Sequence, residues 1–145
     1  MKRLTLTHQR RNPMYEYRVK EVLKVVDGDT IDVIIDLGFD ISFTSRVRLA
    51  GIDTPESRTT DTYEKKLGLE VKDFLKESIK ASKDVVIKTE KVDSSEKYGR
   101  ILGWIFLDGN AESLNTQMVI KGYAWDYDGG TKKKDFEILK KRRGL

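Results

Sequence analysis

The spacing of apolar residues changes twice along the chain, and this order of periods constrains the fold more than any other feature. Three early segments alternate as strands do, at residues 18–26, 31–35 and 43–50. Apolar residues then recur at helical spacing over residues 62–80. Strand-like composition returns twice, at residues 84–92 and 100–107. The sequence therefore predicts three strands, one helix and two further strands.

Two shorter helices are expected after the last strand. One spans residues 114–121, started by Ser113 and ended by Gly122. The other begins at Thr131 and docks through Phe136 and Leu139. This order of elements is that of a mainly β fold with α-helices, a five-stranded Greek-key barrel of the OB type with three helices.

Composition limits the domain organisation and the kinds of site. A chain of 145 residues suits one core, and we expect a domain over residues 15–145 behind a flexible basic tail at residues 1–14. The sequence has no cysteine, which excludes disulfides and thiolate chemistry. Its single histidine, His8, excludes sites built from several histidines. No apolar run reaches membrane-spanning length, and no apolar segment follows Lys2 and Arg3, so we expect an intracellular protein.

Basic residues gather at both ends of the chain. The net charge is +4, residues 1–14 carry +4, and residues 132–145 carry +5, which leaves −5 for residues 15–131. Basic ends around a mildly acidic body suit a polyanionic partner, although such runs are also typical of solvated tails. Lys132, Lys133 and Lys134 fall in the first turn of the expected last helix, where its dipole disfavours them. They either face phosphates or let the helix fray.

Acidic residues at strand ends suggest a metal site. Asp29 opens the second strand and Asp53 follows the third. Oxygen ligands without imidazole or thiolate favour Ca²⁺, with Mg²⁺ or Mn²⁺ as alternatives. Pro55 favours an extended Thr54, whose carbonyl would add a ligand. Asp27 would support these ligands from behind, although an Asp-Gly-Asp sequence by itself is more typical of a turn.

Two arginines and one glutamate complete the candidate site. A guanidinium group matches two phosphate oxygens in one plane and keeps its charge. Arg48 lies on the third strand, where Val47 and Leu49 face the core, so Arg48 is expected to point away from the core. Arg100 leads the fifth strand. Glu56 follows a proline and could take a proton from water. Singly, each is more typical of a solvated surface charge.

Together, these motifs strongly resemble the staphylococcal nuclease family, over about residues 18–143. The segments that carry the resemblance are VVDGDT at residues 25–30, RLAGIDTPE at 48–56 and KYGR at 97–100. The resemblance implies an OB-type barrel that hydrolyses DNA and RNA and leaves 3′-phosphate ends. It assigns Ca²⁺ binding to Asp29, Asp53 and the Thr54 carbonyl, and catalysis to Arg48, Glu56 and Arg100. It also implies substrate contacts by Lys97, Tyr98 and either Tyr123 or Tyr127.

The resemblance also implies partners and an origin for the chain, and other functions remain as alternatives to it. The chain would act on nucleic acid as a monomer, away from membranes, and a phage or prophage origin fits the absence of a secretion signal. A non-catalytic OB module that only binds single strands is the main alternative. Glu70 and Lys72 as a restriction-type E-x-K pair are disfavoured, because residues two apart diverge on a helix. Calcium sensing is disfavoured because EF-hand spacing is missing. Residues 36–44 form a longer segment than in the family's type member.

Overall fold

The structure is a computed structural model that describes residues 15–89 and 100–145. The expected basic tail at residues 1–14 lies outside the described residues. The same holds for the predicted end of the fourth barrel strand at residue 92, and for Lys97 and Tyr98.

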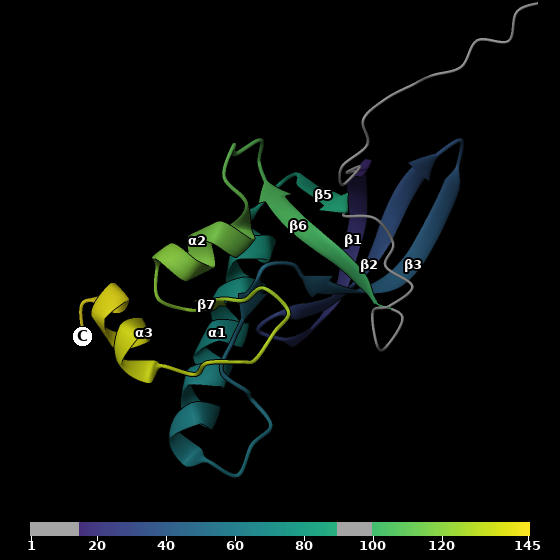
Figure 1. Ribbon diagram of the computed structural model, residues 1–145. Helices are drawn as coiled ribbons and strands as arrows, with labels where there is room; N and C mark the ends of the chain where they lie inside the picture. Colours follow the sequence, from purple (N-terminus) through teal and green to yellow (C-terminus); the bar gives the residue numbers. More distant parts are fainter. Residues whose placement is uncertain (1–14, 90–99) are drawn as a thin grey trace, which may run out of the picture.

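Five strands close into a barrel, as the sequence predicted (Figure 1). The strands follow one another around it in the order β1 (Tyr15–Asp27), β2 (Thr30–Gly38), β3 (Ile41–Leu49), β6 (Ile101–Leu107) and β5 (Val85–Thr89). The β3–β6 pair is parallel and the other pairs are antiparallel. Three helices accompany the barrel in the described residues, α1 (Thr62–Ala81), α2 (Leu114–Ile120) and α3 (Phe136–Arg143). The predicted OB-type, mainly β architecture is confirmed.

The alternation in the strands produces the barrel core. Val33, Val47, Ile87 and Ile105 are fully buried inside it. Helix α1 adds Val71 and Leu75, and α2 adds Met118. Burying a side chain of this size contributes about 1.5–3 kcal/mol. Strand β6 is apolar on both faces, but only its inner residues are buried, while its outer residues are half-buried.

Helix α1 packs very closely on the loop that follows β4 (Ile52–Asp53). The helix begins after Asp61, whose carboxylate accepts the backbone N–H groups of Tyr63 and Glu64. At Gly68, a Cβ atom would lie 2.5 Å from the carbonyl carbon of Glu56. Only glycine permits this approach, so the loop carrying Glu56 lies directly on the helix backbone.

Two very short strands, which the sequence did not predict, fix the segment after β3. Asp53 of β4 pairs with Trp125 of β7 (Trp125–Asp126). The buried amide of Asn115 donates to the carbonyls of Ala50 and Gly103 at 2.8 and 3.0 Å, and its oxygen accepts the Ile105 N–H. These bonds tie the β3–β4 connection to β6. The backbone of Asp53 is therefore held from two sides.

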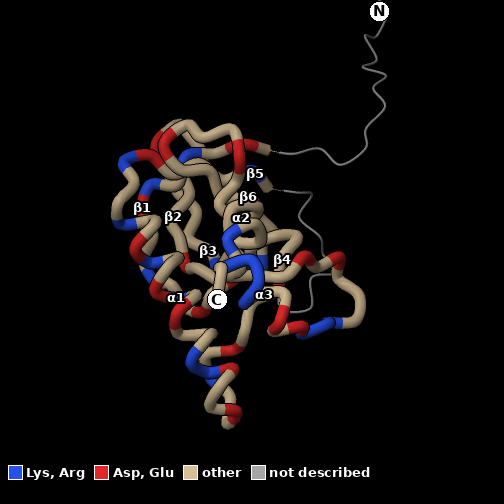
Figure 2. Tube along the Cα trace, turned by 90° about the vertical axis from the view of Figure 1, so that its left-hand side faces the viewer, with Lys and Arg blue, Asp and Glu red and all other residues tan. Residues whose placement is uncertain are grey.

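The last helix begins later than predicted. It starts at Phe136 instead of Thr131, with Asp135 as the N-cap that accepts the N–H groups of Glu137 and Ile138. An aspartate cap suits the positive end of the dipole, whereas the three preceding lysines do not. The lysines at 132–134 therefore lie in the loop that leads into α3, and the prediction that they form its first turn is wrong (Figure 2).

None of the helices in the two described ranges is both long and apolar enough to cross a membrane. The longest, α1, alternates basic and acidic positions along its length (Figure 2).

Candidate active site

Three charged side chains meet at one end of the β2–β3 pair. Asp29 precedes β2, Arg48 lies near the end of β3, and Asp53 lies on β4. The Arg48 Nη2 atom is 3.4 Å from Asp29 Oδ2 and 3.8 Å from Asp53 Oδ1. The backbone reinforces this arrangement, because the Leu49 N–H donates to the Asp29 carbonyl at 2.8 Å. The β1–β2 turn and the end of β3 thus bring opposite charges together.

Arg48 is buried, with 8% of its surface exposed. The predicted alternation holds, since Val47 and Leu49 belong to the core while Arg48 does not. Its face of β3 is nevertheless covered, because Asp29 and Asp53 lie against the guanidinium group. Its Nη1 atom donates to the Leu49 carbonyl at 2.9 Å. Arg48 is therefore fixed by three groups inside the protein.

Asp53 has the most unusual environment of the group. It is 4% exposed, and its Oδ2 atom is buried without a hydrogen-bond partner. Burial raises the pKa of this carboxyl, and Asp29 adds to the rise, while Lys132 and Arg48 oppose it. The Nζ atom of Lys132 lies 3.5 Å from Asp53 Oδ1. A buried carboxylate oxygen without a partner is costly, which makes it a candidate ligand atom.

The donor atoms fit a hard cation. Asp29 and Asp53 supply carboxylates, and the neighbouring Thr54 is buried beside them with a backbone carbonyl. Within the described residues there is no cluster of three or more His, Cys, Asp or Glu side chains arranged for a metal. The predicted set contains only two carboxylates, and Ca²⁺ or Mg²⁺ completes its coordination with carbonyls and water. The orphaned Asp53 oxygen supports this fit.

Asp27 occupies a supporting position. Its Oδ1 atom accepts the Gly28 N–H at 3.0 Å and the Ser57 hydroxyl at 2.8 Å. These bonds join the β1–β2 turn to the loop after Pro55. Gly28 itself is needed for close packing, because a Cβ there would lie 2.7 Å from Val71. The Asp-Gly-Asp sequence is therefore both a turn and a contact with α1.

Glu56 lies beside this group and remains accessible. Its side chain is 54% exposed, and Lys134 Nζ lies 3.7 Å from its Oε1 atom. Its backbone N–H donates to Glu64 Oε2 at 3.0 Å. Glu56 therefore combines a fixed backbone with a carboxylate that solvent can reach, as a group that acts on water requires.

Arg100 immediately precedes β6. In the parallel β3–β6 register, Leu102 pairs with Arg48. Arg100 is two positions before Leu102, level with Arg46, which places it toward the same face as Arg48 and roughly 7 Å closer to the starts of the two strands. The register thus brings the two predicted arginines to neighbouring positions on one side of the barrel wall.

The residues predicted to contact the substrate do not all lie near the charged group. Tyr98 and Lys97 lie outside the described residues. The ring of Tyr123 stacks on Phe74 at 4.2 Å and lies under the Arg143 guanidinium at 4.3 Å, so these contacts join α1 to α3. Tyr127 instead donates its backbone N–H to Gly51, and Lys132 Nζ lies 5.8 Å from its ring centre. Of the two candidate tyrosines, Tyr127 is connected to the site, because Lys132 contacts both its ring and Asp53.

Sequence reasoning missed three side chains that touch the predicted site. Lys132 contacts Asp53, while Lys134 and Glu64 both contact Glu56. The lysines carried a signal, since three cations were expected at an unfavourable helix end. Glu64 gave none, because an acid in the first turn of a helix is ordinary.

The fold and the charged cluster define an OB-type barrel with a polar site where β1–β2, β3 and β4 meet. Residues 46–143 match the family model described as "Staphylococcal nuclease homologue", which is more than half of the chain. This chain belongs to that family.

Three curated relatives extend the comparison. An uncharacterized protein of Methanocaldococcus jannaschii is 30% identical, over 83% of this chain and 65% of the relative. A protein of Shigella flexneri named micrococcal nuclease is 33% identical, over 74% of this chain and 57% of the relative. A Staphylococcus hyicus protein named thermonuclease is 32% identical, over 72% and 56%. The chain spans less than two thirds of the length of each.

Proposed function

We propose that this chain is a metal-dependent nuclease that hydrolyses phosphodiester bonds of DNA, with RNA as a second candidate substrate. Membership of the family and the relatives' names support this proposal. The observation that carries it is the Asp29–Arg48–Asp53 group, in which Arg48 and Asp53 are buried, with the accessible carboxylate of Glu56 beside it. We also propose that residues 15–145 act as one domain, and as a monomer, on substrates that leave 3′-phosphate ends.

Each residue has a role that its surroundings suit. Glu56 takes a proton from the attacking water, since its carboxylate is accessible and its backbone is fixed. Arg48 and Arg100 donate hydrogen bonds to phosphoryl oxygens as charge builds up in the five-coordinate transition state. Arg48 is already oriented by its own bonds, so little rearrangement is needed when the substrate arrives.

Asp29, Asp53 and the Thr54 carbonyl would hold a divalent cation, and Ca²⁺ is the proposed ion. When bound, such a cation neutralises charge at the phosphate as a Lewis acid. Asp27 and Gly28 keep the turn that carries Asp29 against the Thr54 loop. This chain's own contribution is to hold two acids and an arginine close together, with Arg48 and Asp53 buried.

The decisive variant is Arg100→Ala. Removing a donor that stabilises charge in the transition state typically lowers kcat by about 10²–10³. We expect Arg100→Ala to remain folded by circular dichroism and to lose activity on that scale. Arg18→Ala is the matched control, because Arg18 is exposed on β1, away from the β3–β6 pair. A fully active Arg100→Ala protein would remove Arg100 from the mechanism.

The substrate and the ion are tested together. Single- and double-stranded DNA and RNA are incubated with Ca²⁺, Mg²⁺ or chelator, and the ends of the products are analysed. Cleavage in Ca²⁺ that leaves 3′-phosphates, and that chelator abolishes, supports the proposal. Tight binding to single strands with no turnover in either ion would instead support the non-catalytic OB module.

A further inference from the structure

Glu64 is a buried carboxylate that contacts the predicted general base. It is the third residue of α1 and is 8% exposed. Its Oε2 atom accepts two hydrogen bonds, one from the Glu56 N–H at 3.0 Å and one from Lys134 Nζ at 2.9 Å. One oxygen atom thus joins the Glu56 loop, the start of α1 and the segment before α3.

The start of the helix does not require this burial. Asp61 already caps α1 by accepting the N–H groups of Tyr63 and Glu64. A glutamate in the first turn interacts favourably with the dipole when it is exposed to solvent. Removing a carboxylate from water is costly unless it is paired and hydrogen-bonded. The burial of Glu64 therefore serves its partners more than its own helix.

Lys134 extends the contact to the carboxylate of Glu56. Its Nζ atom lies 3.7 Å from Glu56 Oε1 while it donates to Glu64. Burial lowers the pKa of Lys134, but the hydrogen bond and charge of Glu64, with those of Glu56 and Asp53, outweigh it and raise the pKa. Lys134 therefore keeps its positive charge between the carboxylates of Glu56 and Glu64.

The position of Lys134 is set by the partner strand of Asp53. The Trp125 indole N–H donates to the Asp135 carbonyl at 2.8 Å, and Trp125 pairs with Asp53 across the β4–β7 ladder. Asp135 is the next residue after Lys134. The segment before α3 is therefore tied to the same short sheet that holds Asp53.

The Glu56 loop is held from both directions. Gly68 lets the Glu56 backbone lie directly on α1, so the loop cannot move closer to the helix. The hydrogen bond from the Glu56 N–H to Glu64 keeps the loop from moving away. The position of the Glu56 carboxylate, which is otherwise exposed, is limited by these two contacts and by Lys134.

We propose that Glu64 is a positioning residue for Glu56, and that Lys134 links it to the C-terminal segment. This inference rests on the proposed function, because it assigns a partner to the group that acts on water. Glu64 need not touch the substrate. Its loss should therefore lower kcat and leave KM nearly unchanged.

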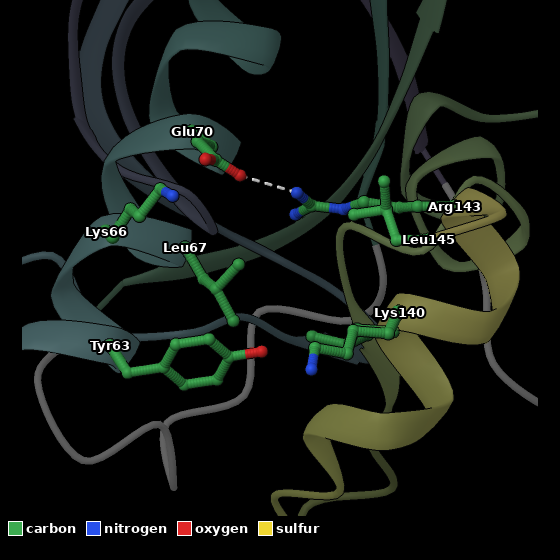
Figure 3. A pocket seen from close by; sticks show the side chains of 8 residues that line it. Tyr63, Lys66, Leu67, Glu70, Lys140, Arg143 and Leu145 are labelled. Carbon is green, nitrogen blue, oxygen red and sulfur yellow. Dashed lines mark hydrogen bonds and ion pairs between the residues drawn. The ribbon is translucent and has the colours of Figure 1, made fainter.

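The Glu70–Arg143 ion pair provides a matched control. It also joins α1 to the C-terminal helix, with Arg143 Nη1 2.6 Å from Glu70 Oε2, but Glu70 lies six residues beyond Glu64. This pair borders a cavity of about 170 Å³ between α1 and α3 (Figure 3). Glu70→Gln removes an interhelical ion pair and leaves the contacts of Glu56 with Glu64 and Lys134 intact.

The first test is steady-state kinetics. We expect Glu64→Ala to lower kcat by about 10–100-fold, as the loss of a hydrogen-bond partner behind a metal ligand does, with KM within about twofold. Glu64→Gln keeps an acceptor for the Glu56 N–H and should restore part of the loss. Glu70→Gln should match wild type. In a Glu56→Gln background, Glu64→Ala should have little further effect, because the group it positions is already inactive. Equal losses in Glu64→Ala and Glu70→Gln, or fully additive losses with Glu56→Gln, would overturn the proposal.

The second test does not depend on turnover. Amide hydrogen exchange at Glu56 should accelerate in Glu64→Ala and remain slow in Glu70→Gln. Unchanged exchange in Glu64→Ala would overturn the positioning role even if kcat falls. If the wild-type protein cleaves no substrate, the proposed function fails, and the exchange measurement still decides whether Glu64 fixes the loop.

Discussion

The two ends of the β2–β3 hairpin place their side chains in opposite ways. At the end near the site, charged Arg48 is buried, and Asp29 beside it is only partly exposed. At the far end, residues 36–44 are all exposed and include large apolar side chains, with Phe39 at 96% exposure. In Figure 1 this end of the hairpin extends beyond the barrel. Buried charge and exposed apolar surface thus occur on the same pair of strands.

The two ends differ in whether neighbouring groups compensate for the unfavourable placement of their side chains. Arg48 has contacts with two carboxylates and a carbonyl. At the tip, Phe39 and Asp40 have φ values of 54° and 60°, which non-glycine residues adopt at a cost. Compensated buried charge indicates a site organised for chemistry, whereas the tip carries local strain that the barrel tolerates.

The largest expected effect comes from removing the charge at the buried end. Arg48→Met should lower the free energy of unfolding by about 3 kcal/mol, because it leaves the buried Asp53 and its neighbour Asp29 without their arginine. Arg46→Met is the control on the same strand, since Arg46 is half-exposed and pairs with Asp32. Urea unfolding at pH 7 measures both. Equal losses would mean that Arg48 is no more constrained than a surface arginine.

A bound cation should strengthen the same end. If Ca²⁺ binds at Asp29 and Asp53, free Ca²⁺ at 100 times its Kd should raise the free energy of unfolding by about 2.7 kcal/mol. Thermal unfolding with and without Ca²⁺ measures this. Asp53→Asn should abolish the increase, and Asp32→Asn, on the outer face of β2, should retain it. An increase that survives Asp53→Asn would place the ion elsewhere.

The far end should respond to relief of strain. Replacing Phe39 with Asn and Asp40 with Gly supplies residues that tolerate positive φ in a two-residue hairpin turn. We expect a gain of about 1 kcal/mol in chemical unfolding, with nuclease activity unchanged. Phe39→Leu still requires a positive φ and should give no comparable gain. Lost activity in the Asn-Gly variant would connect the tip to the site.

The smallest effect is expected between the two ends. Arg46 donates two hydrogen bonds to Asp32 and lowers the pKa of that carboxyl. A carboxyl with a lowered folded-state pKa contributes stability above its unfolded value, about 3.9, and this contribution disappears as the pH falls through the folded pKa. The stability difference between wild type and Asp32→Asn should therefore be present at pH 7 and vanish near pH 2. A difference independent of pH would exclude the ion pair as its source.

The barrel could be predicted because its signals are local. Alternation over residues 31–35 and 43–50 predicted two strands, and their inward-facing residues include the buried Val33 and Val47. The helical period over residues 62–80 matched α1 within one residue at its C-terminal end. The predicted start of α3 at Thr131 was wrong, because Asp135 caps the helix and the lysines at 132–134 stay outside it.

The site was only partly predictable. Asp29, Arg48 and Asp53 could be selected by residue type and motif, and the structure brings them together. The contacts of Glu64 with Lys134 could not be foreseen, because they depend on a two-residue ladder that has no periodic signature. The burial of Arg48 was missed for a similar reason, since alternation describes a strand and not the loops that cover it.

The hydrogen bond between Lys134 and Glu64 joins residues 70 positions apart in the chain. The β1–β5 pair that closes the barrel joins residues equally far apart, such as Tyr15 and Thr89. Closing the barrel and completing the site therefore both require the ends of a long loop to meet, at a similar entropic cost. A molecule with its strands already paired would still have a loosely held Glu56 until the segment before α3 reached α1.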